Sequence, residues 1–171
     1  SAKSDVVQKL VPNALWYFRY AALFTFLTGL YLIHYLSIAI NISIILGAVL
    51  GTFMFLNVWL IIWPNQKKVI SGSPDAADAG AKAGLASRTN TLFSIPMLWF
   101  MVYSAHGTAI GNTILSLEES LLSLWVGLVL IAIIEANAVW GKMNAAITSV
   151  KAVIHSGVAL TVILGLIVCY L

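Results

Sequence analysis

The chain has 171 residues, of which 61% are hydrophobic and only 9% are charged, far from the composition of an average soluble domain. The net charge of +3 comes from basic residues that membrane topology explains, so nucleic acid is not an expected partner. The single cysteine, Cys169, excludes an internal disulfide framework, a cysteine-based zinc site and covalent haem attachment through CxxCH. The composition indicates an integral membrane protein.

Five apolar runs approach the length of about 20 residues that crosses a bilayer as a helix. The first, 14–36, has aromatic residues at both ends, like the belts that flank a membrane. The second, 42–63, contains Gly47 and Gly51 at a spacing that lets a neighbouring helix approach closely, unless they are incidental glycines. Pro64 is expected to end this helix, because the residue before a proline is disfavoured in the helical region.

The loop 64–89 is small and polar, and its Ser73-Pro74 start with acidic residues after it predicts a short surface helix to about Ser87. The third run, 90–106, is short, and Pro96 is expected to kink it. Runs four and five follow at about 120–140 and 148–171. The predicted fold is an all-α, polytopic transmembrane bundle of one domain, with five spans here and a sixth expected upstream of Ser1.

The basic residues predict the orientation of this bundle. All nine fall on one side of the predicted topology: Lys3, Lys9, Arg19, Lys67, Lys68, Lys82, Arg88, Lys142 and Lys151. The opposite side carries Glu118 and Glu119. By the positive-inside rule, the start of the chain and the loop 64–89 are expected in the cytoplasm and the C-terminus outside.

Polar residues inside the predicted spans form a layer near the cytoplasmic side. Its members are Arg19, Asn57, Asn90, Glu135, Asn137 and His155. Buried ionisable groups in membranes usually pair with one another, so Glu135 is expected to pair with Arg19 or His155. The layer is either a polar pocket for a substrate or a proton path, or an interfacial layer that staples the helices together.

Two histidines, His34 and His106, end the first and third spans at the opposite side. At equal depth on two helices they could ligate one haem iron from both sides; alternatively, both are interfacial side chains in contact with water. His155 is a candidate single ligand. No HxxxH or ExxH spacing predicts a metal site other than haem iron.

Several stretches resemble the membrane domain of the bacterial membrane-bound urate oxidase (urate hydroxylase) family. They are NVWLIIWPNQKKVI at 57–70, ASRTNTLFSIPMLWFMVYSAH at 86–106, EANAVWG at 135–141, VKAVIHSGVAL at 150–160 and LVPNALWYFRYAALFTFLTGLYL at 10–32. The positions that match the family pattern are Asn57, Trp63, Pro64, Gln66, Lys67, Arg88, Asn90, Pro96, His106, Glu135, Asn137 and His155. The resemblance implies the short form without the cytochrome c domain, in the bacterial inner membrane.

Three functions follow as hypotheses. The first is a redox or electron-transfer protein of the urate oxidase type that binds haem b through one of its histidines. The second is a non-catalytic accessory subunit of a larger membrane complex, or a homo-oligomer, surrounded by lipid. The third, a transporter or channel, would need inverted repeats or paired broken helices, whereas the sequence shows one proline-broken span and no repeat.

Overall fold

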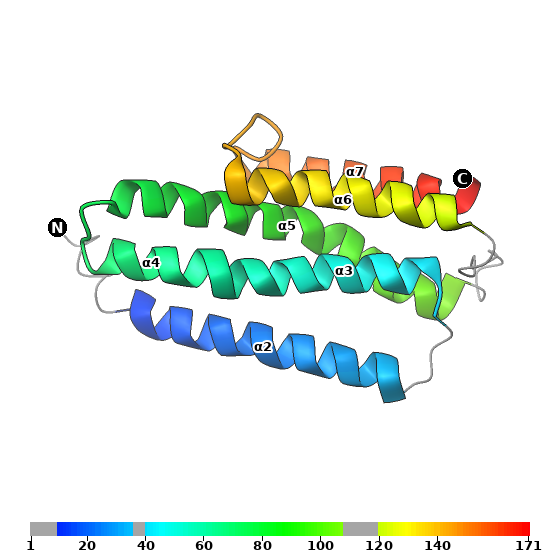
Figure 1. Ribbon diagram of the computed structural model, residues 1–171, viewed down its shortest axis with the longest axis horizontal. Coiled ribbons are helices and arrows are strands. Elements are labelled where there is room, and N and C mark those ends of the chain that lie inside the picture. The colour runs from blue at the N-terminus through cyan, green and yellow to red at the C-terminus, as the bar shows by residue number, and fades with distance from the viewer. Residues whose placement is uncertain (1–9, 36–39, 108–119) are drawn as a thin grey trace.

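The computed structural model describes residues 10–35, 40–107 and 120–171, and all its regular elements are helices. These are α2 (Val11–Tyr35), α3 (Ile42–Leu56), the π-helix η1 (Asn57–Ile62), α4 (Trp63–Ile70), α5 (Ala76–His106), α6 (Leu121–Trp140) and α7 (Val150–Tyr170). Because α3, η1 and α4 follow one another without a break, the chain forms five elongated rods that lie side by side (Figure 1).

Three of the five rods are long and apolar enough to cross a membrane, whereas the sequence predicts five spans. They are Ile42–Ile70, Leu121–Trp140 and Val150–Tyr170. In α2, Arg19 and several tyrosines reduce the apolar character of the helix. In α5, the first half is polar or small, and the apolar stretch after Asn90 is short.

The second rod does not end at Pro64, as the sequence predicts, but continues to Ile70. In a regular α-helix the ring of Pro64 would clash with the carbonyl four residues before it. Here the turns before it are a π-helix, and the Trp63 amide donates to the carbonyl of Val58, five residues back. Pro64 then lies in the first turn of α4, where its missing N–H costs little. The Asn65 Nδ2 group donates a hydrogen bond to the Ile61 carbonyl oxygen at 2.8 Å.

The expected loop 64–89 is mostly helical. It consists of α4, a turn over 71–75 and the first turns of α5. Gly72 has a φ of 66°, a conformation that glycine adopts without steric cost, and Lys68 pairs with Asp75 across the turn at 2.7 Å. The predicted surface helix is therefore the first part of α5, which runs through Pro96 to His106. Alanines of this part are buried, including Ala79, Ala83 and Ala86, which lets α5 pack closely on α4.

The core surrounds α5, which packs on α3, α4, α6 and α7. Its fully buried Phe93 and Phe100 contact a cluster from α3, α6 and α7 that includes Leu46, Ile131 and Leu164. Gly47 allows the close approach of α3 and α5 that its spacing predicts, because a Cβ there would lie 3.3 Å from that of Phe100. In contrast, α2 has no buried residue, and its main contacts are with the rod of α3, η1 and α4.

The described basic residues gather toward one end of the bundle. At this end α2 begins, α4 turns into α5, and α6 connects to α7 (Figure 1). Lys67 and Lys68 occupy the last turn of α4, Lys142 follows α6, and Lys151 lies in the first turn of α7. The opposite end holds the ends of α2 and α5, with His34 and His106.

Candidate functional site

A buried polar network connects three helices within the apolar core. The Asn57 Nδ2 group donates to Glu135 Oε2 at 3.1 Å and to Asn90 Oδ1 at 3.0 Å. Asn57 is 1% exposed and Glu135 8% exposed. The sequence predicts these three residues at one depth, and the structure brings them into direct contact. We call Asn57, Asn90 and Glu135 the polar network.

The π-helix gives this network its geometry. Asn57 is the first residue of η1, where the backbone bonding changes from the i−4 to the i−5 pattern. Just before this change, the Met54 carbonyl accepts a hydrogen bond from Asn90 Nδ2 at 3.0 Å. Single π-turns inside α-helices are frequent at functional sites. Asn57 Oδ1 is buried and has no hydrogen-bond partner among the described residues.

Arg19 does not pair with Glu135. Its guanidinium carbon lies 3.9 Å from the ring centroid of Trp63 and 4.4 Å from that of Trp59, and Nη2 donates to the Tyr20 hydroxyl at 2.8 Å. Cation–π contacts therefore hold Arg19 and join α2 to η1 and α4. The tryptophans are spaced four residues apart, a pattern that places both rings on one helix face; the sequence reading missed this.

His155 does not pair with Glu135 either. It is exposed in the second turn of α7 and makes no hydrogen bond to another described residue. Asn137 is half-buried two residues after Glu135, and no described residue bonds to its side chain. Within the described ranges the single ion pair is Lys68–Asp75.

The other two histidines are exposed at the opposite end from His155. His34 lies in the last turn of α2, and His106 is the last residue of α5. The two histidines that the sequence pairs across one haem iron, His34 and His106, therefore lie toward the same end of the bundle, and His155 lies toward the other end, because α5 and α7 run in the same direction (Figure 1). In the parts of the chain that the structure describes, no group of three or more His, Cys, Asp or Glu residues could hold a metal ion.

A groove of about 630 Å³ lies between α2, the α3–η1 rod and α5. We call it the lateral groove. Its walls are mainly apolar, with Phe26 and Phe55 stacked at 4.6 Å between ring centroids. Asn90 belongs both to the polar network and to the lining, so it connects the buried carboxyl to this space. None of the three histidines lines the groove.

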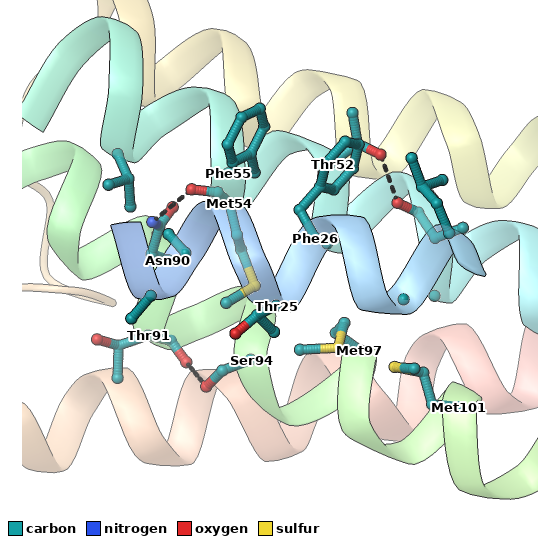
Figure 2. A pocket seen from close by; sticks show the side chains of 18 of the residues that line it. Thr25, Phe26, Thr52, Met54, Phe55, Asn90, Thr91, Ser94, Met97 and Met101 are labelled. Atoms are coloured by element: carbon teal, nitrogen blue, oxygen red, sulfur yellow. Dashed lines mark hydrogen bonds between the residues drawn. The ribbon is translucent and has the colours of Figure 1, made fainter. Parts of the chain in front are cut away.

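Figure 2 shows how the lateral groove is divided along its length. Asn90, Thr91 and Ser94 from α5 lie toward one part of it, and Met97 and Met101 toward the other. The sequence predicts Asn90 as a site residue but not the groove. The residues of α2 that line the groove are mostly small or apolar, and their spacing is that of any helix packed in a bundle.

A family model described as urate oxidase N-terminal matches residues 38–168, and it includes α3 through most of α7. No curated protein and no solved structure matches the chain. The match covers all three members of the polar network.

Proposed function

Because the chain belongs to the urate oxidase N-terminal family, we propose that it is the membrane-embedded part of a urate oxidase-type redox system in the bacterial inner membrane. All five rods cross or enter the bilayer, with the basic end in the cytoplasm. In this proposal the polar network handles protons for the oxidation of urate or a related purine.

The observation that carries the proposal is the position of Glu135. A carboxyl group inside an apolar bundle is costly, and such residues usually mark proton or substrate paths in membrane proteins. Its hydrogen-bond partner is the neutral amide of Asn57, and no cationic side chain pairs with it among the described residues. A proton is then the simplest partner that can neutralise it.

The amides of Asn57 and Asn90 extend this site from the core to the lateral groove. Each asparagine side chain offers one acceptor oxygen and a donor NH₂ group. The buried Asn57 Oδ1 has no donor among the described residues, so the amide that bonds to Glu135 also carries an acceptor that a proton donor could use. A proton can thus be held at the Glu135 carboxyl and presented toward Asn90 and the groove.

The orientation in this proposal rests on the distribution of charge. The lysines of α4, α7 and the α6–α7 connection lie at one end of the bundle. Basic residues are enriched in cytoplasmic loops of membrane proteins. Spans of α2 and α5 complete the five-span arrangement, with Arg19 held by aromatic rings near the cytoplasmic interface.

Haem b is the cofactor that the redox hypothesis suggests, with His34, His106 or His155 as ligands. The three rings are exposed, whereas a haem-binding histidine normally belongs to a pocket that encloses the porphyrin. Among the described residues, none of these histidines lies in an enclosed pocket of the size of a porphyrin. An absorption spectrum of the purified protein tests the hypothesis: a Soret band that His106→Ala or His155→Ala abolishes would support haem binding.

The proton role of Glu135 can be tested with the full-length protein in membrane vesicles. Glu135→Gln keeps the size and hydrogen-bonding capacity of the side chain but removes its titratable proton. We expect urate consumption to fall about a hundredfold, the usual contribution of general acid–base groups. Asp78→Asn, at an exposed carboxyl of α5, is the matched control and should keep the wild-type rate. A Glu135→Gln protein that is folded and fully active would contradict the proposal.

The second candidate is an accessory subunit of a larger membrane complex. It is supported by α2, which has no buried residue and exposes large side chains such as Phe24, Leu27 and Tyr31. If this is the function, the protein should co-purify in mild detergent with a fixed partner, and Glu135→Gln should leave the activity of that complex unchanged. A single species of the size of this chain would argue against it.

A further inference from the structure

We propose that the lateral groove binds an isoprenoid quinone that enters from the bilayer. The site itself rests on the shape and lining of the groove. The choice of a quinone over another lipid rests on the redox function proposed above, because oxidation of a purine needs an electron acceptor and a quinone is one that dissolves in the membrane.

The size and position of the groove suit such a ligand. Its volume of about 630 Å³ lies within the range of small-molecule sites. The main contacts of α2 are with the α3–η1–α4 rod, and the groove lies where α2 and α5 both line it beside that rod. In a bilayer this arrangement admits a ligand from the lipid phase rather than from water.

The lining has the two parts that an amphiphile with a long tail requires. Met97 and Met101 line the part farther along α5 (Figure 2), and methionine side chains adapt readily to irregular apolar ligands. Gly29 on α2 and Gly51 on α3 leave room there, since a Cβ added to Gly29 would meet nothing within 4 Å and one on Gly51 only Met97 at 4.0 Å. The tail is expected in this part.

The polar part suits a small uncharged head group. Asn90, Thr91 and Ser94 line it, and no charged side chain is among the lining residues that the structure describes. Thr91 and Ser94 donate their hydroxyl protons to carbonyls of their own helix, so their oxygens remain as acceptors. One Asn90 Nδ2 hydrogen is used by the Met54 carbonyl, and the second remains to donate.

This set of groups matches both redox forms of a quinone. A quinone carbonyl accepts a hydrogen bond, which Asn90 can donate, and a quinol hydroxyl donates one, which Thr91 and Ser94 can accept. A charged phospholipid head group would find no counter-charge in this lining. The head group would lie beside Asn90, which bonds to Asn57 and through it to the Glu135 carboxyl.

Binding can be measured with decyl-benzoquinone and the full-length protein in lipid nanodiscs, by counting retained quinone after gel filtration over a concentration series. We expect saturable binding of about one quinone per chain. Gly29→Phe and Gly51→Leu, which fill the groove from two different helices, should each weaken binding at least tenfold. Gly84→Leu is the matched control, because Gly84 lies outside the groove lining and a Cβ there meets nothing within 4 Å.

Three results would overturn the inference: absence of saturable binding, unchanged affinity in both filled variants, or equal competition by dioleoylglycerol, which would indicate a general lipid groove. Thermal melting of each variant shows whether it is folded. If one of the two groove-filling variants does not fold, the other still tests the binding site. The result is separate from the proposed function, since quinone binding does not depend on urate turnover. If Glu135→Gln is inactive but the wild-type protein binds no quinone, the proton role of Glu135 stands and the proposed groove ligand is rejected.

Discussion

The Asn57 side-chain nitrogen lies 3.1 Å from a Glu135 carboxyl oxygen and joins two helices whose bonded residues are 78 positions apart in the sequence. The same nitrogen also bonds to Asn90, so one amide holds three helices together. Both residues of the 3.1 Å bond are buried. Their contact is therefore part of the core and of the candidate site at once.

Substitution of Asn57 by Ala should destabilise the protein by about 1–3 kcal/mol, because the buried Glu135 and the half-buried Asn90 would lose this donor. Unfolding in mixed detergent micelles measures the change. Asn137→Ala is the control, since its side chain has no described hydrogen-bond partner, and it should change the stability by no more than roughly 0.5 kcal/mol. Equal effects of the two variants would contradict a structural role for the network.

The sequence predicts the all-α class and the common depth of Asn57, Asn90 and Glu135, because apolar run length and side-chain polarity determine both. It does not predict which of them bond. The sequence predicts a charged partner for Glu135, but Arg19 is held by Trp59 and Trp63 instead, and His155 is exposed. Pairing depends on helix rotation, which a single sequence does not specify.

The helix ends are less predictable still. Local backbone preferences predict that the helix ends before Pro64. The π-helix before it places Pro64 in the first turn of α4, where no hydrogen bond from its nitrogen is required. Such a turn depends on tertiary packing, which is not visible in the sequence. For the same reason the lateral groove, which is lined by residues of three different rods, could not be predicted from any one segment.

At Gly157, α7 packs so closely against α5 that an added Cβ would displace neighbouring atoms. A Cβ there would lie 2.7 Å from Ile95 Cδ1 and 3.2 Å from the Leu92 carbonyl oxygen. Gly157→Ala should therefore destabilise the protein by about 1–3 kcal/mol through overpacking. Gly165→Ala on the same helix has its nearest neighbour at 3.9 Å, so it should be neutral or slightly stabilising. The same unfolding assay compares them, and a neutral Gly157→Ala would mean that α5 and α7 lie farther apart.

Arg19→Lys should weaken the attachment of α2 to η1 and α4. The planar guanidinium stacks on aromatic rings, and an ammonium group cannot reproduce this; the expected loss is roughly 0.5–2 kcal/mol. Because the rings of Trp59 and Trp63 are the partners, tryptophan fluorescence should also change. Arg88→Lys, at a half-buried arginine without a cation–π contact in the described residues, should leave the spectrum unchanged. A spectrum that responds only to Arg88→Lys would refute this role.

The turn between α4 and α5 is expected to respond to acid. Lys68 bonds to the Asp75 carboxylate at 2.7 Å and Ser73 donates to it as well, and these bonds lower the pKa of Asp75 from 3.8 to about 2. Since the folded value is the lower one, the turn gains stability from this carboxylate above about pH 4 and loses it as the pH falls toward 2. The side-chain carbon resonance of Asp75 should titrate with a midpoint near 2.

Substitution of Lys68 and Lys67 one at a time distinguishes the direct Lys68–Asp75 contact from the general effect of positive charge near Asp75. Lys68→Met removes the largest cause of the lowered pKa, so the Asp75 midpoint should rise toward 3.8. Lys67→Met removes a lysine that lies over the Trp63 ring and not against Asp75, and the midpoint should stay near 2. A similar rise in both variants would show that the positive charge of the α4 end, rather than the Lys68–Asp75 contact, stabilises the carboxylate. In that case the turn would be held by its backbone, with Gly72 in its left-handed conformation, and not by this ion pair.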